Sequence, residues 1–77
     1  MKAVEVKTIG IRESDGKRIV DVLIVSDDTP SPLPTDGTNV DGLTSEHIFA
    51  PFSVLYVVGD ADKKVYIANE SGTFIPQ

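Results

Sequence analysis

The chain has 77 residues, which suffices for one small domain with a thin hydrophobic core. It contains no cysteine and one histidine, so disulfides and a zinc site built from thiolates and imidazoles are excluded. The net charge of −5 argues against binding to nucleic acid or to an anionic membrane surface, because both need clustered Lys and Arg. The sequence has no apolar run of the roughly 20 residues that span a bilayer and no signal-peptide pattern, so we expect a soluble protein made in the cytoplasm.

The first predicted element is a β-strand over residues 3–13. Its apolar residues alternate with polar ones, but the phase of the alternation changes between Val6 and Ile9. Such a change turns the apolar face over unless a bulge absorbs one residue, and glycine tolerates a bulge well. We therefore predict a β-bulge or bend near Thr8–Gly10.

A tight turn and a second strand follow. The pair Asp15-Gly16 is typical of a hairpin turn, because glycine accepts positive φ without steric cost. Residues 18–26 read RIVDVLIVS and are the most apolar stretch of the chain. A run this continuous predicts a central strand that is covered on both faces or buried by a partner chain.

Residues 27–45 predict a long loop rich in Pro, Asp and Gly. Pro30, Pro32 and Pro34 fix the backbone and remove hydrogen-bond donors, so this segment cannot be a central strand. A loop of this length in so small a domain is usually functional or disordered. Its start fits either a ligand for an aromatic-lined groove or a stiff arm that reaches a neighbouring subunit. We favour the arm, because the core is thin and the loop is long.

The C-terminal part predicts a three-strand meander. Residues 44–50 have the pattern of one helical turn, which Pro51 would end. Short apolar runs then cover residues 53–58, 64–68 and 73–75, with turn-forming Gly, Asp and Asn between them.

Few residues are suited to catalysis or metal binding. His47 would need a nucleophile and an orienting acid to act as a general base, and the adjacent Glu46 does not provide that geometry. Six acidic residues offer oxygens to calcium, but turn formation explains them better. These are Asp27, Asp28, Asp36, Asp41, Asp60 and Asp62. Because a glycine-rich phosphate loop is also missing, we expect no enzymatic activity, no metal or cofactor, and no small-molecule substrate.

The candidate interaction residues lie in two short segments. The first is the Pro-rich arm and the second flanks Ala50-Pro51, where aromatic side chains are candidates for exposure at an interface. The candidates are Pro30, Pro32, Leu33, Pro34, Phe49 and Phe52.

The order of short motifs in the C-terminal half resembles that of small, mostly uncharacterised proteins encoded by tailed bacteriophages and prophages. The motifs are LPTDG (33–37), DGL (41–43), FAP (49–51), SVLYVV (53–58) and KVYIANESGTF (64–74). The resemblance covers roughly residues 33–76 and implies a role in virion morphogenesis, without implying any catalytic residue. Phe52 stands where the resembling proteins carry a small residue, often glycine.

The sequence thus predicts a single all-β domain over residues 1–77, with about five strands in a small sandwich or partly open barrel. An N-terminal hairpin and a C-terminal three-strand meander are joined by the Pro-rich loop. We expect a non-enzymatic structural or assembly protein that associates with itself or with another phage structural protein, in the host cytoplasm or the virion. The alternative is a monomeric module that binds a protein or a peptide.

Overall fold

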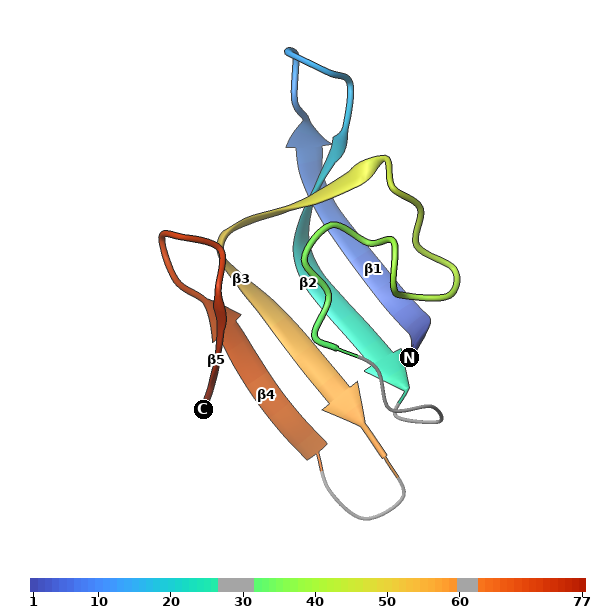
Figure 1. Ribbon diagram of the computed structural model, residues 1–77, viewed down its shortest axis with the longest axis vertical. Coiled ribbons are helices and arrows are strands. Elements are labelled where there is room, and N and C mark those ends of the chain that lie inside the picture. Colours follow the sequence, from blue (N-terminus) through green and yellow to red (C-terminus); the bar gives the residue numbers. More distant parts are fainter. Residues whose placement is uncertain (27–31, 60–62) are drawn as a thin grey trace.

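The computed structural model describes residues 1–26, 32–59 and 63–77, which form a single five-stranded sheet (Figure 1). The strands are β1 (Lys2–Ile11), β2 (Arg18–Ser26), β3 (His47–Val58), β4 (Lys63–Ala68) and β5 (Phe74–Pro76). Their order in the sheet follows the sequence, and all neighbours are antiparallel except β2 and β3, which are parallel. No helix of the described residues is long and apolar enough to cross a membrane.

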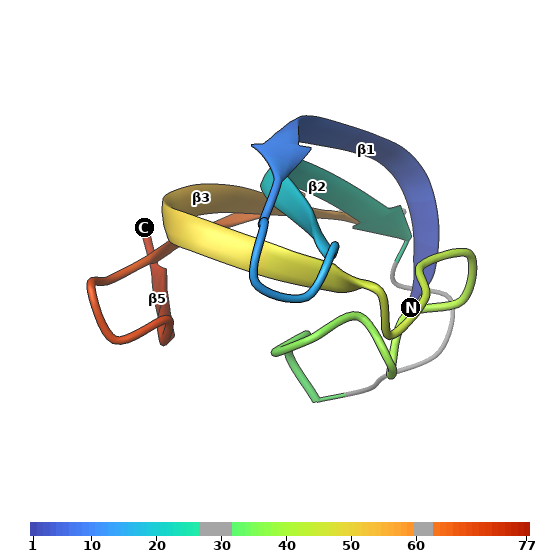
Figure 2. The ribbon, with the colours of Figure 1, turned by 90° about the horizontal axis from the view of Figure 1, so that it is seen from above.

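The expected all-β architecture with five strands is confirmed. The strands lie side by side in one curved sheet that does not close into a barrel (Figures 1 and 2). The N-terminal hairpin and the C-terminal meander are both present, and they join edge to edge through β2 and β3 rather than stacking face to face.

The hairpin of β1 and β2 has the predicted irregularity. Its register shifts between Lys7 and Thr8 and again between Thr8 and Gly10, and a further shift lies between Ala3 and Glu5. These bulges let β1 stay paired with β2 although its apolar phase changes.

The hairpin turn also forms as predicted. Gly16 has a φ of 72°, and the backbone N–H of Arg12 donates to the carbonyl of Lys17 over 2.8 Å. The Arg12 guanidinium pairs with Asp15 within the turn, and this hydrogen bond lowers the pKa of Asp15 to about 2.

Strand β3 starts earlier than the sequence indicates. The helical turn expected over residues 44–50 is wrong, because a tight turn from Thr44 leads directly into β3 at His47. In that turn the N–H of His47 donates to the carbonyl of Thr44 over 3.3 Å. The N–H of Arg18 donates to the carbonyl of Glu46 over 2.9 Å, so pairing with β2 satisfies backbone groups of this segment.

β3 bends in its middle. Val20 of β2 pairs with Phe49 and Val22 pairs with Val54, so residues 50–53 of β3 stand opposite a single residue of β2. Phe52 lies in this bulge with a φ of 62°, which is a left-handed conformation that bulky residues rarely adopt. The bend turns the start of β3 across the sheet (Figure 2).

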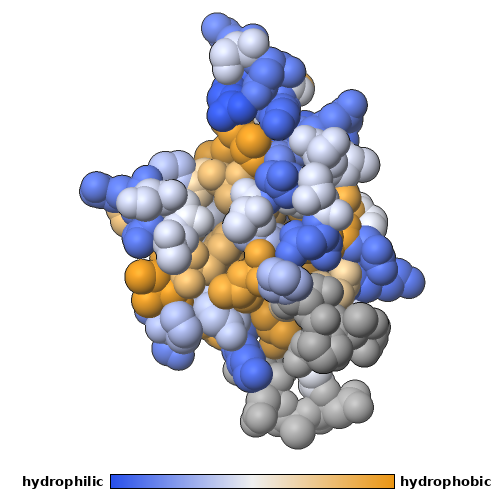
Figure 3. Space-filling view, in the orientation of Figure 1, coloured by the Kyte–Doolittle hydropathy of each residue, from blue (hydrophilic) through white to orange (hydrophobic). Residues whose placement is uncertain are grey.

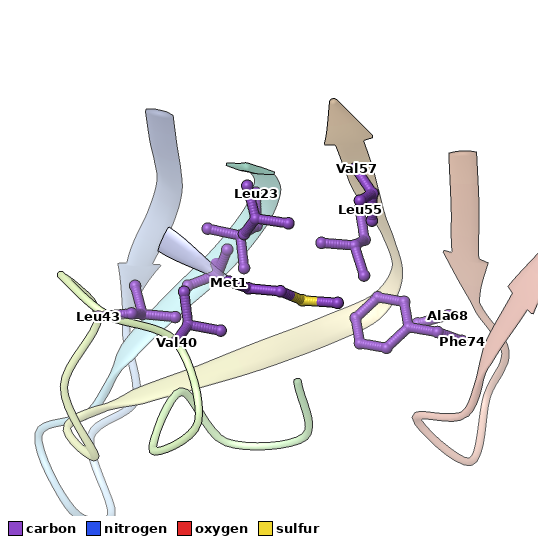
Figure 4. Close-up of a cluster of buried hydrophobic side chains, with 10 residues drawn as sticks. Met1, Leu23, Val40, Leu43, Leu55, Val57, Ala68 and Phe74 are labelled. Carbon is purple, nitrogen blue, oxygen red and sulfur yellow. The ribbon is translucent and has the colours of Figure 1, made fainter. Parts of the chain in front are cut away.

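One face of the sheet carries the core. Residues 32–46, called the covering segment from here on, lie across this face (Figures 1 and 2). The segment contributes Val40 and Leu43 to the core, and the side chain of Met1 reaches between them and the sheet (Figure 4). The strand residues of this buried hydrophobic cluster are Val20, Leu23, Val25, Leu55, Val57, Ala68 and Phe74.

Backbone hydrogen bonds fix the covering segment to the start of β1. The N–H of Ala3 donates to the carbonyl of Asp41 over 2.7 Å, and the N–H of Asp41 donates to the carbonyl of Met1 over 3.0 Å. Gly37 has a φ of 93°, and a Cβ there would lie 2.6 Å from the carbonyl oxygen of Thr44. The covering segment is therefore part of the folded domain and has its own tight turns.

Candidate interaction surface

The second face of the sheet is apolar but carries no covering segment. Strand register and alternation place eight apolar side chains on it, here called the open face. They are Val22, Ile24, Val54, Tyr56, Val58, Val65, Ile67 and Ile75. None of the eight is fully buried, whereas their neighbours Leu23, Val25 and Leu55 are.

Seven of the eight side chains form two rows across the sheet, and Val58 pairs with Ser26 beyond these rows. One row runs from Ile24 through Tyr56 to Val65, and Glu5 of β1 continues it. The adjacent row consists of Lys7, Val22, Val54, Ile67 and Ile75. Only the β1 end of each row is charged, and there Lys7 Nζ lies 4.0 Å from Glu5 Oε1.

Among residues 1–26, 32–59 and 63–77, no segment lies across the open face, which is the convex side of the curved sheet (Figure 2). Tyr56 is 38% exposed and Ile75 is 45% exposed. Figure 3 shows the opposite, covered face, on which polar and hydrophobic residues are both visible. A continuous apolar sheet face without a cover is typical of an interaction surface.

The two edges of the sheet are poorly suited to pairing with another strand. Strand β1 is interrupted by bulges, which twist an edge away from a partner. Strand β5 has only three residues and ends at Pro76, which lacks an N–H donor. The structure thus favours association through the open face over association through the edges.

The arm residues predicted from the sequence lie in different environments. Pro34 is fully buried, and Leu33 is half-buried against the core. Pro32 is exposed, and Pro30 lies outside the described residues. Because Leu33 and Pro34 pack on the chain's own sheet, this part of the loop covers the domain rather than extending from it.

The two candidate phenylalanines also differ. Phe49 is half-buried at the margin of the core, where its ring meets that of Phe74 edge to face, with 5.5 Å between the ring centroids. Phe52 is 61% exposed and lies in the β3 bulge, apart from the core. Neither belongs to the open face.

The ring of His47 contacts the turn that precedes β3. Its ring is buried, and Nδ1 lies 3.2 Å from Thr44 Oγ1 and 3.3 Å from the Thr44 carbonyl oxygen. Those contacts join His47 to the turn that starts β3. In the part of the chain that the structure describes, no three His, Asp or Glu side chains lie close enough to hold a metal ion.

The structure describes two of the acidic candidates for calcium binding, Asp36 and Asp41. Asp36 accepts hydrogen bonds from the Thr38 N–H over 2.9 Å and from Thr38 Oγ1 over 2.7 Å, and the backbone bond lowers the pKa of Asp36 most. This is the turn chemistry expected of Asp at such a position. The backbone of Asp41 fixes the covering segment to β1. Asp27, Asp28, Asp60 and Asp62 lie outside the described residues.

An open groove lies along β4 and β5. It is lined by Lys64, Val65, Tyr66, Ile67, Pro76 and Gln77. The side chains of Val65, Ile67 and Pro76 offer apolar contact, and those of Lys64, Tyr66 and Gln77 offer hydrogen-bond donors.

The sequence predicted that residues 18–26 are covered on both faces or buried by a partner chain, but it did not single out the residues of the open face on the other strands. The signal was present in residues 53–58 and 18–26, which are apolar in both phases of the alternation. A strand that is apolar in both phases needs a cover on both faces.

A scan against protein-family models and searches of curated proteins and of solved structures found no match for this chain. What the chain does is therefore inferred from its own residues and surfaces.

Proposed function

We propose that this chain is a non-enzymatic structural or assembly protein of the bacteriophage or prophage type, and that it works by association through its open face. The observation that carries the proposal is the uncovered apolar face itself. Eight apolar side chains lie on β2 to β5, and no described segment lies over them. Burial of apolar surface is the main driving force of protein association. The phage setting comes from the motif order in residues 33–76.

The charge of the chain supports the same role. The net charge is −5, while the only charged side chains that flank the two rows on β1, Glu5 and Lys7, have opposite signs. Repulsion between copies keeps a protein soluble before assembly. From β2 to β5 the two rows add no charge that would have to be desolvated in a contact.

The proposal is tested by mass spectrometry of particles purified after induction of the source strain. We expect peptides of this chain at a fixed ratio to a capsid or tail protein. Presence of the protein in the lysate but not in particles would contradict a virion role, and the host cytoplasm would then be its place of action. A matched pair of variants, Tyr56→Glu on the open face and Ile11→Lys outside it, shows whether incorporation depends on that face.

The groove along β4 and β5 supports a second candidate function, a monomeric module that binds a protein or a peptide. Tyr66 and Pro76 give the groove an apolar lining beside a short edge strand. An extended peptide is the ligand class that such a groove beside a sheet edge accepts. The oligomeric state separates the two functions. Self-association that increases with protein concentration favours the assembly protein, because the binding module stays monomeric at all concentrations.

A further inference from the structure

We propose that the partner of the open face is a second copy of the same chain, and that the two copies stack face to face as a two-fold symmetric sandwich. This inference rests on the proposed function and names its partner. In the dimer, the two-fold axis lies in the interface, perpendicular to the strands and between the two rows of the open face. Each row of one copy then lies over the other row of the second copy.

Packing favours this arrangement. The axis places the row of Ile24, Tyr56 and Val65 over the row of Val22, Val54 and Ile67 of the second copy. The largest side chain of the open face, Tyr56, then meets the smaller Val54 of the second copy in both halves of the interface. Facing sheets pack best when large and small side chains interdigitate.

Charge complementarity points to the same axis. Glu5 belongs to one row and Lys7 to the other, and both are exposed on β1. Exchange of the rows by the two-fold axis brings Glu5 of each copy towards Lys7 of the other. An axis parallel to the strands would instead place β1 over β5, where the described residues offer no charged side chain to either of them.

The expected contact is of modest size. With strands about 4.8 Å apart, a five-stranded sheet is roughly 20 Å wide, and stacking buries on the order of 500 Å² per copy. The total of roughly 1,000 Å² is at the lower end for specific interfaces, so we expect a dissociation constant in the micromolar range. Because the open face is convex, the contact centres on β2, β3 and β4, and Glu5 and Lys7 of β1 lie at its margin.

The first test is analytical ultracentrifugation of the whole chain across micromolar concentrations. We expect a reversible monomer–dimer equilibrium. Tyr56→Glu places a charge in the centre of the apolar contact and should weaken the dimer at least about a hundredfold. Ile11→Lys is the matched control, because Ile11 is 64% exposed but lies outside the open face, and it should leave the dimer unchanged.

The second test identifies the symmetry. Glu5→Lys gives two lysines per copy that face two lysines of the other copy, and Lys7→Glu gives two carboxylates that face two carboxylates. Each variant alone should dimerise several-fold more weakly than the unmodified chain. An equimolar mixture of the two variants should recover the affinity, because both contacts between unlike copies are then of opposite charge. Both positions are exposed, so neither change threatens the fold.

The outcomes separate this inference from the proposed function. A chain that stays monomeric at all concentrations would overturn the dimer, and so would a Tyr56→Glu variant that dimerises as before. If that monomeric chain nevertheless enters particles and Tyr56→Glu prevents its entry, the proposed function stands and another virion protein covers the open face. If the chain dimerises but the equimolar mixture of the Glu5→Lys and Lys7→Glu variants does not recover the affinity, the two-fold axis described above would be wrong.

Discussion

The two faces of the sheet are built from the same strands and the same kinds of residue, yet the described residues place a covering segment over only one of them. In β2, Leu23 is fully buried and its neighbour Ile24 is only half-buried. In β3 the same holds for Leu55 and Tyr56. The difference arises from chain connection rather than from hydrophobicity. Because β2 and β3 are parallel, the chain must return along the sheet between them, and this return places the covering segment on one face.

The largest expected effect comes from adjacent residues of β2. Leu23→Ala should lower the free energy of unfolding by about 3 kcal/mol, because it leaves a cavity in the covered core. Ile24→Ala should cost about 1 kcal/mol in the monomer, because its side chain already contacts water on the open face. Urea denaturation at low protein concentration, where any dimer has dissociated, measures both values. Equal costs would mean that the open face is covered within the monomer.

The covering segment should also contribute strongly to stability. Leu43→Ala removes a side chain that is 6% exposed and packs in the core, so we expect a loss of about 2 kcal/mol. Thr35→Ala changes an exposed residue of the same segment and should alter stability by less than about 0.5 kcal/mol. Thermal denaturation followed by circular dichroism compares the two variants. A stable Leu43→Ala variant would restore the interpretation of this loop as a separate arm.

A stabilising change is expected at the β3 bulge. Phe52 has a φ of 62° and is 61% exposed, so its side chain gains little from burial while its backbone is strained. Phe52→Gly should raise the free energy of unfolding by about 1 kcal/mol, because glycine adopts this φ without strain. Phe49→Gly, at a half-buried position with ordinary φ, should destabilise instead. A drop in stability for Phe52→Gly would show that the exposed ring makes contacts that outweigh the strain.

The smallest expected effect is a loss of folding stability at acidic pH. The folded-state pKa values of Asp15 and Asp36 are lowered, that of Asp15 from 3.8 to about 2. A carboxylate whose pKa is lowered by folding stabilises the folded state above its unfolded pKa and loses this contribution as the pH falls through its folded pKa. The contribution of these two carboxylates to stability should therefore be complete above about pH 5 and decline as the pH drops below the ordinary aspartate range of about 3.9. The variants Asp15→Asn and Asp36→Asn should each flatten the slope of this decline in a series of denaturation curves.

Local signals predicted much of the fold. The phase change in residues 3–13 predicted the bulges of β1, and Asp15-Gly16 predicted the hairpin turn. Residues 44–50 were misassigned because their pairing partner, Arg18–Val20, lies far away in the sequence. A short segment with weak helical preference forms a strand when a neighbouring strand supplies its hydrogen bonds.

The candidate interaction surface was harder to predict for a related reason. Leu33 and Pro34 are apolar residues in a loop, and such residues suit either an exposed arm or the cover of a core. Only the position of the loop relative to the sheet decides between the two. Likewise, β2 and β3 are apolar in both phases, so the sequence indicates that both faces need a cover without indicating which one the chain covers itself.

The parallel pairing of β2 with β3 also constrains how the domain folds. The hairpin of β1 and β2 is a local structure that forms on a timescale of about 1–10 μs, but it has no core of its own. Contacts such as Val20 with Phe49 require closure of the whole connection between the strands before they contribute. During synthesis on the ribosome, β2 must therefore wait with both apolar sides in water until β3 has emerged. Folding should consequently be slow for a chain of 77 residues, and the nascent hairpin is its most aggregation-prone stage.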